Sequence, residues 1–151
     1  MNEEAKSRAL RLLDKRDYSR AELIRKLTEK GIDEADAAEA VDYLVSLGFV
    51  DDARYAPLLV RRCAAKGYGR ARAKQELQKR GIDRALWDAA LTELPEQEET
   101  IDRLLRSRLR SAEPDRAELK RASDALLRRG FGWDEVKRAL ARYQADIEEE
   151  E

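Results

Sequence analysis

The fold is decided by a short stretch that occurs three times: LTEKGID at residues 27–33, LQKRGID at residues 77–83 and LLRRGFG at residues 126–132. The shared glycines, Gly31, Gly81 and Gly130, are 50 and 49 residues apart. Apolar residues keep the same phase around them, and ten positions after each glycine stand Val41, Leu91 and Leu140. Self-similarity at a fixed period is the sequence signature of a repeat protein, so we interpret the chain as three tandem units.

Each unit is predicted to form three helices, because apolar residues recur at close to the helical period. Ser19 and Glu22 have the spacing of a capping box, in which each side chain bonds the other residue's backbone amide at a helix start. Gly31 should end that helix, since glycine adopts the left-handed conformation without strain. The predicted helices span residues 4–16, 20–30 and 34–47, then 52–66, 70–80 and 84–93, then 96–111, 115–129 and 133–147.

The predicted fold class is all-α. No stretch shows the sustained alternation and β-branched composition of a strand. A three-helix unit of this size buries little apolar surface alone, and neighbouring units should therefore stack. We expect three tandem three-helix repeats, at residues 1–48, 49–95 and 96–151, stacked into an elongated, curved molecule, with an acidic tail on the third repeat.

Composition excludes several classes of function. The 151 residues include no histidine, so a histidine-based triad or imidazole metal site is impossible. The single cysteine, Cys63, cannot form an internal disulfide or a thiolate cluster. With no nucleophile–base pair or metal cluster visible, we predict no catalytic residue, no metal and no cofactor. No apolar run reaches the roughly 20 residues that span a bilayer and no secretory signal is visible, so we expect a soluble, cytoplasmic protein.

Positive charge is concentrated in the middle of the chain. The whole chain has 31 basic and 32 acidic residues, but residues 61–80 hold eight basic residues against Glu76 alone. Such a segment indicates an anionic partner, although acids of neighbouring units could also balance it. The predicted partner-binding residues in it are Arg61, Arg62, Lys66, Arg70, Arg72 and Lys74. Arg70 and Arg72 are preferred because they begin a helix after a turn at residues 67–69 that we expect to be flexible.

A second basic stripe is expected on the first helix of the third unit. Arg103, Arg106 and Arg110 are spaced i, i+3 and i+7, so they share one face of that helix. They form either a second contact patch for the partner or an ordinary solvated stripe opposite the apolar face.

Two acids and a tyrosine precede the central basic segment. We expect Asp51 or Asp52 to cap the helix at residues 52–66, because a helix start stabilises carboxylates. Tyr55 should pack on the first unit. An aspartate pair can also form a metal or acid–base site, but no further ligand or partner group supports one here. These three residues, like the three shared glycines, are therefore predicted to be structural.

The motifs resemble those of the RecX family, regulators of the RecA recombinase filament. Residues 18–31 carry the family's opening pattern, with Tyr-Ser followed by Glu-Leu, Lys-Leu and Lys-Gly, and residues 48–56 (GFVDDARYA) carry its most distinctive part. The resemblance covers about residues 5–145 and is weakest in the third unit, where Gly132 replaces the aspartate that follows the other two glycines.

The resemblance implies a non-enzymatic regulator that binds the RecA–DNA filament and mostly inhibits its recombinase, ATPase and co-protease activities. It places the protein in DNA recombination, DNA repair and the SOS response. We expect a monomer that contacts DNA within the filament and binds DNA weakly alone. The alternative is a helical-repeat protein that binds nucleic acid directly, which requires tight, steeply salt-dependent binding to bare DNA. A net charge of −1 and the acidic tail argue against that alternative.

Overall fold

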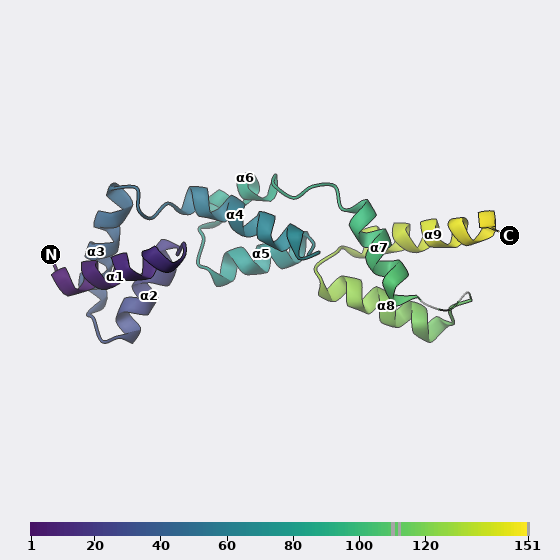
Figure 1. Ribbon diagram of the computed structural model, residues 1–151, viewed down its shortest axis with the longest axis horizontal. Coiled ribbons are helices and arrows are strands. Elements are labelled where there is room, and N and C mark those ends of the chain that lie inside the picture. Colours follow the sequence, from purple (N-terminus) through teal and green to yellow (C-terminus); the bar gives the residue numbers. More distant parts are fainter. Residues whose placement is uncertain (110, 112, 151) are drawn as a thin grey trace. The chain divides into compact units, whose positions relative to one another are not determined.

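The computed structural model describes residues 1–109, 111 and 113–150, and over this part of the chain every regular element is a helix (Figure 1). The elements are α1 (Glu3–Lys15), α2 (Arg20–Glu29), α3 (Glu34–Ser46), α4 (Asp52–Ala65), α5 (Arg70–Lys79), the 3₁₀ turn η1 (Arg84–Leu86), α6 (Trp87–Leu91), α7 (Glu98–Arg108), α8 (Arg116–Arg128) and α9 (Trp133–Glu150). The prediction of an all-α fold built from three-helix repeats is confirmed. Within the described residues, no helix is both long enough and apolar enough to cross a membrane.

Local signals set the helix ends as the sequence indicates. The Ser19 hydroxyl oxygen accepts a hydrogen bond from the Glu22 amide (3.0 Å), and the Glu22 carboxylate accepts one from the Ser19 amide (3.1 Å). This reciprocal pair is the predicted capping box at the start of α2. After α2, Gly31 has a φ of 89°, and the Ile32 amide donates back to the Leu27 carbonyl (3.2 Å). The turn therefore satisfies a free carbonyl at the helix end.

The last helix of the second repeat differs from the prediction of one helix over residues 84–93. The 3₁₀ turn η1 leads there into α6, which has five residues. The Asp83 side chain caps this segment through one backbone amide, whereas Asp33 caps α3 through two. Fewer free amides are thus satisfied at the start, which favours a tighter and shorter element. Pro95 and Pro114 lie before the starts of α7 and α8.

The helices form two compact units, and the second repeat is divided between them. Unit 1 comprises Met1–Leu59 and Glu76–Ala90, and unit 2 comprises Val60–Gln75 and Leu91–Glu151. Helices α4 and α5 each contribute one part to unit 1 and the other part to unit 2. The compact units therefore cut across the sequence repeats.

Each unit has its own apolar core. The largest fully buried apolar side chains are Leu23, Leu27, Val41, Leu44 and Leu77 in unit 1 and Val60, Ile101, Leu105, Leu126 and Val136 in unit 2. Each such side chain contributes about 1.5–3 kcal/mol through removal of apolar surface from water. The helices are thus held in each unit by the apolar faces that the sequence periodicity predicts.

In unit 1, the end of α5 is fixed to the start of α2. The Ser19 hydroxyl donates a hydrogen bond to the Arg80 carbonyl. A Cβ atom on Gly81 would lie 2.5 Å from the Cβ of Ala21, and Gly81 has a φ of 72°. Glycine is therefore required at this position for close approach as well as for backbone conformation. This contact joins the first repeat to the second.

Unit 2 contains the same kind of contact between the second and third repeats. The Gly69 amide donates to the Arg129 carbonyl (2.8 Å), and the Ala71 amide donates to the Gly130 carbonyl (3.1 Å). A Cβ on Gly69 would lie 2.5 Å from the Gly130 carbonyl oxygen. In both units, the start of one repeat's second helix packs on the glycine turn that ends the next repeat's second helix. We call this arrangement the repeat joint.

Candidate nucleic-acid interface

The part of the second repeat that belongs to unit 2 is basic throughout. Residues 60–75 contain six basic residues and no acidic one. They are the six residues predicted to bind a partner: Arg61, Arg62, Lys66, Arg70, Arg72 and Lys74. Glu76, the one acid of the central basic segment, falls in unit 1. The structure therefore places all six predicted cations on one compact unit.

Four of these six side chains are exposed and form no ion pair with a carboxylate of the described residues: Arg62, Lys66, Arg70 and Lys74. We call these four residues the basic set. Arg62 is in the last turn of α4 and Lys66 directly follows that helix, while Arg70 and Lys74 are four residues apart on α5 and share one side of it. Their charges are available to an anionic ligand without the loss of an internal ion pair.

Arg61 and Arg72 have partners within unit 2. Arg61 Nη1 lies 3.3 Å from a carboxylate oxygen of Glu93. Arg72 is half-buried, and its guanidinium carbon lies 4.4 Å from the centre of the Tyr68 ring. The Arg129 guanidinium lies 5.8 Å from the same ring. Arg72 therefore belongs to the repeat joint, and the turn before it is held by the hydrogen bond from the Gly69 amide to the carbonyl of Arg129, directly after α8, in contrast to the flexible turn that we expected.

The second predicted stripe, on α7, is partly neutralised by α9. Arg103 is exposed and has no described carboxylate partner, but Arg106 Nη2 lies 2.5 Å from Asp146 Oδ2 on α9. Arg110 lies outside the described residues. On α9 itself, Arg142 Nη2 lies 2.7 Å from Asp102 Oδ1, and this hydrogen bond raises the pKa of the Arg142 guanidinium. Of the two described arginines of this stripe, Arg103 and Arg106, only Arg103 thus resembles the basic set.

Arg80, also part of the central basic segment, has a structural role in unit 1 that the sequence did not indicate. Its guanidinium lies 2.9 Å from both Glu22 and Glu76. The Glu22 side chain is 2% exposed and also lies 3.4 Å from Arg16. Burial alone would raise the pKa of Glu22, but the Ser19 amide and Arg80 outweigh burial and hold that pKa below its usual range. The capping-box spacing indicated Glu22, and the i, i+4 spacing from Glu76 was a usable local signal for Arg80, but no local pattern indicated the pair between Arg80 and Glu22.

Asp51, Asp52 and Tyr55 lie where α4 begins. Asp51 Oδ1 accepts a hydrogen bond from the Arg54 amide (3.2 Å), while Asp52 Oδ1 accepts one from the Arg20 amide (3.0 Å) at the start of α2. Burial raises the pKa of Asp52 above its usual value. The Tyr55 ring is buried in unit 1. No cluster of three or more potential metal-ligating side chains occurs among the described residues. The carboxylates of both aspartates instead accept hydrogen bonds from backbone amides.

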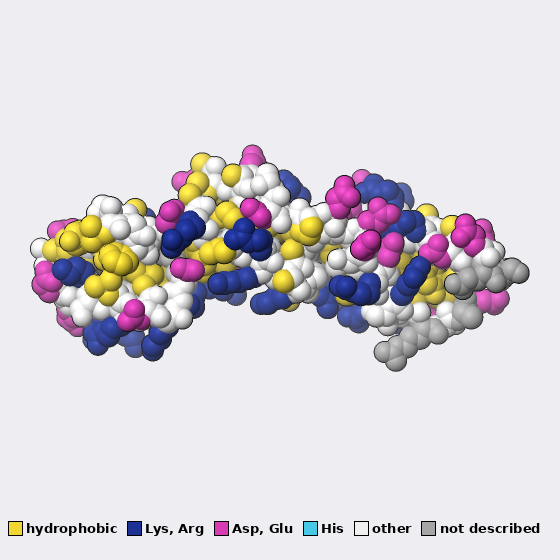
Figure 2. Space-filling model, turned by 45° about the horizontal axis from the view of Figure 1, so that its top comes forward, with side chains coloured by type: hydrophobic (Ala, Val, Ile, Leu, Met, Phe, Trp, Pro, Cys, Tyr) yellow, Lys and Arg dark blue, Asp and Glu magenta, His cyan; other side chains and the backbone are white. Residues whose placement is uncertain are grey.

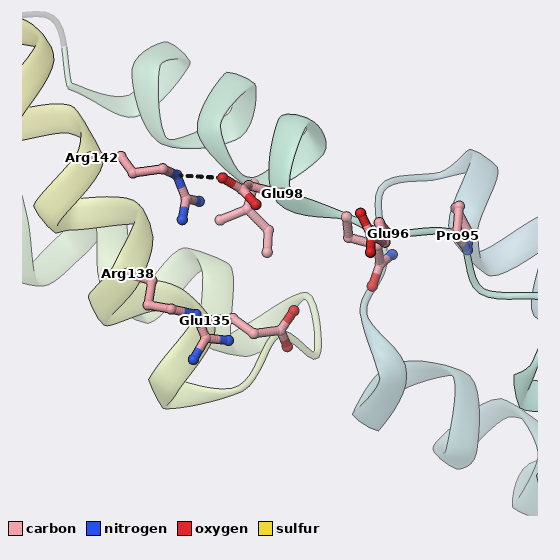
Figure 3. A pocket seen from close by; sticks show the side chains of 8 residues that line it. Pro95, Glu96, Glu98, Glu135, Arg138 and Arg142 are labelled. Atoms are coloured by element: carbon pink, nitrogen blue, oxygen red, sulfur yellow. Dashed lines mark ion pairs between the residues drawn. The ribbon is translucent and has the colours of Figure 1, made fainter.

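Unit 2 also contains an open pocket of about 290 Å³ between the start of α7 and α9 (Figure 3). Glu96, Glu98, Arg138 and Arg142 line it, so charges of both signs are present. Arg142 pairs with Glu98 across the pocket (3.3 Å), and the Glu135 carboxylate accepts a hydrogen bond from the Gly132 amide (3.0 Å) at the start of α9. Arg142 and Glu98 thus satisfy one another, and the mixed charges of the lining indicate no particular ligand.

Acidic and basic side chains are interspersed over the surface seen in Figure 2. The structure defines a helical-repeat protein of three three-helix domains, in which one compact unit contains the four exposed cations of the basic set. Models of the first, second and third three-helix domains of RecX match residues 5–44, 51–91 and 96–140, in that order. The chain therefore belongs to the RecX family, and the prediction from residues 18–31 and 48–56 is confirmed.

Individual relatives agree with this assignment. "Regulatory protein RecX" of Stenotrophomonas maltophilia strain K279a is 42% identical over 141 residues, which cover 92% of this chain and 86% of that protein. The protein of the same name from Vibrio campbellii is 31% identical over 139 residues, covering 91% of this chain and 90% of that protein. The crystal structure of RecX from Lactobacillus salivarius has the same fold, with a TM-score of 0.83 at 24% identity over 95% of this chain and 96% of that one.

Proposed function

We propose that this RecX-family protein binds the RecA–DNA filament in the cytoplasm and lowers its recombinase, ATPase and co-protease activities, without covalent chemistry. The relatives named as regulatory proteins support a regulatory role. The observation that carries the proposal is the basic set of unit 2, whose four side chains are exposed and unpaired with described carboxylates. Exposed Lys and Arg side chains are the groups that most often contact DNA phosphates.

The charge balance of unit 2 argues for weak binding to bare DNA. Each phosphate that a protein neutralises releases counterions, so affinity grows with the number of free cations. Unit 2 has 18 basic but also 16 acidic residues, and several of its arginines already pair with carboxylates. We propose that a monomer contacts DNA within the filament, where protein surfaces of the recombinase add to the phosphate contacts.

The test is the single-strand-DNA-dependent ATPase rate of RecA, titrated with this protein. A parallel titration follows binding to bare single-stranded DNA by fluorescence anisotropy. We expect inhibition at concentrations well below those that coat bare DNA. Inhibition that only tracks DNA coating would instead favour the second candidate, a direct nucleic-acid-binding protein, for which the same four cations would serve as phosphate contacts. No inhibition at any concentration would refute the proposed regulation.

A matched pair of variants on α5 tests the role of the basic set. Lys74→Glu and Lys79→Glu make the same charge change at exposed positions of α5. The two positions are five residues apart, so they lie on different sides of the helix. We expect Lys74→Glu to raise the half-inhibiting concentration at least about threefold and to lower the salt slope of DNA binding by about 1. Lys79→Glu should leave both quantities near the wild-type values. Equal effects of the two substitutions would contradict the proposal that the basic set contacts DNA and the filament.

A further inference from the structure

A second basic surface lies on unit 1, away from the central basic segment. An open groove of about 180 Å³ between α1 and α2 is lined by Arg8, Arg11, Leu12, Lys15, Lys26, Leu27 and Lys30. Five of these seven lining residues are basic and none is acidic. Unit 1 as a whole has 13 basic and 16 acidic residues, so the groove is a local exception to the charge of its unit. Figure 2 shows basic side chains gathered along the lower edge of the part formed by α1, α2 and α3.

Helix geometry brings these cations together. On α1, Arg8, Arg11 and Lys15 are spaced i, i+3 and i+7, so they lie on one face. Lys26 and Lys30 are four residues apart at the end of α2. The packing of α1 on α2 then places both groups around the same groove.

Most of this charge is not neutralised within the described chain. Arg8 Nε lies 3.1 Å from a carboxylate oxygen of Glu4, one turn earlier on α1. For Arg11, Lys15, Lys26 and Lys30, no carboxylate of the described residues lies within ion-pair distance. Like charges around one groove repel one another, and an anionic ligand would relieve that repulsion.

The floor of the groove identifies the kind of anion. Leu12 is half-buried and packs on the apolar core of unit 1, to which the fully buried Leu27 belongs. DNA phosphates are contacted by polar and cationic groups and make no use of a leucine floor. An amphipathic protein segment does, because its apolar side chains occupy such a floor while its charged side chains face the rim.

We propose that the groove between α1 and α2 binds an acidic, amphipathic segment of a partner protein. An apolar side chain of that segment rests on Leu12. Its carboxylates pair with Arg11 and Lys15 on one wall and with Lys26 and Lys30 on the other. The groove shares no residue with the basic set of unit 2, so this inference does not depend on the proposed regulation of the RecA filament.

The test measures binding of a fluorescein-labelled peptide, EELEELLEE, to the full chain by anisotropy. We expect saturable binding that weakens at least about tenfold, or about 1.4 kcal/mol, when the three leucines of the peptide are replaced by glutamines. Binding should also weaken as salt is raised, because the rim is exposed. Failure of the leucine-containing peptide to bind below about 1 mM would overturn the proposal, as would equal binding of the two peptides.

Two neighbouring residues of α2 provide matched variants. Lys26 lines the groove and Arg25 does not, and replacement of either by glutamate changes the net charge equally. We expect Lys26→Glu to weaken binding of the peptide at least about tenfold, and Arg25→Glu to leave it within about twofold of wild type. Lys30→Glu provides a second groove variant if circular dichroism shows that Lys26→Glu fails to fold. Equal losses in Lys26→Glu and Arg25→Glu would overturn the proposal.

A labelled oligothymidylate of similar charge, titrated against the same variants, distinguishes a peptide groove from a nucleic-acid groove. We expect Lys26→Glu to leave binding of this oligonucleotide within about twofold of wild type, since the basic set is unchanged. A larger loss for the oligonucleotide than for the peptide would overturn the inference and assign the groove to nucleic acid.

Discussion

Replacement of Arg80 by methionine should destabilise unit 1 strongly. The Arg80 guanidinium lies 2.9 Å from Glu22, whose side chain is 2% exposed. Methionine keeps much of the side-chain bulk but removes the positive charge, so the Glu22 carboxylate stays buried with fewer counter-charges. Removal of one partner from a buried ion pair costs about 3–5 kcal/mol, because the remaining charge is no longer compensated.

The contacts that Glu22 keeps in the Arg80→Met variant place the expected loss of stability at the lower end of that range. The Ser19 amide still donates to Glu22 (3.1 Å), and Arg16 Nη2 still lies 3.4 Å from it. The lost pair between Arg80 and Glu76 is an i, i+4 pair of partly exposed side chains and adds about 0.3–0.5 kcal/mol. We expect a loss of about 3 kcal/mol in the free energy of unfolding, which is roughly a 100-fold change in the equilibrium constant.

Urea denaturation followed by circular dichroism measures this loss. Lys79→Met, at the exposed neighbouring position, is the control and should change stability by less than about 0.5 kcal/mol. A double-mutant cycle with Glu22→Gln should give a coupling of about 2 kcal/mol between Glu22 and Arg80. Equal losses of stability in Arg80→Met and Lys79→Met, or a cycle without coupling, would contradict this role of Arg80.

Three further results are expected. Gly130 and Gly31 have similar φ values of 97° and 89°, but a Cβ on Gly130 would lie 2.4 Å from the Arg72 amide, whereas one on Gly31 meets nothing within 4 Å. Urea denaturation should therefore show that Gly130→Ala destabilises the protein by about 1–3 kcal/mol more than Gly31→Ala, and equal losses would contradict the repeat joint. The pKa of Glu22 is held below its usual value, so the stability that its charged form provides is present near neutral pH and is lost as the pH falls through that lowered pKa. In a series of urea titrations, the difference in the free energy of unfolding between wild type and Glu22→Gln should therefore narrow below about pH 4. A difference that stays constant with pH would show that the charge of Glu22 does not provide this stability. Asp146→Asn removes the ion-pair partner of Arg106 and should strengthen binding to bare single-stranded DNA by about twofold. The control is Asp124→Asn, which makes the same change in charge but removes the exposed i, i+4 partner of Lys120. Anisotropy titrations that give one affinity for both variants would exclude a role for Arg106 in DNA binding.

Much of the fold was predictable because its signals are local. The capping box of Ser19 and Glu22 and the left-handed Gly31 both act within a few residues of the helix ends that they determine. The short α6 was missed because its cap is weaker than that of α3, a difference in hydrogen bonding that the shared aspartate does not reveal. The groove on unit 1 was also missed, although the i, i+3, i+7 spacing of Arg8, Arg11 and Lys15 was a usable signal. Its second wall is contributed by α2, which only packing brings beside α1.

The helices, the three-fold repetition and the positions of the central cations follow from the amino-acid sequence. Which of those cations are free of ion pairs follows from the packing of the helices. Arg70 and Arg80 stand ten residues apart in one basic segment, yet Arg70 is exposed while Arg80 is held by Glu22, which is 58 residues earlier in the chain. The Arg72 guanidinium likewise stacks on the ring of Tyr68, near the residues that end α8. Helix formation depends on neighbours within about four residues, whereas ion pairing and burial depend on which distant surfaces pack together.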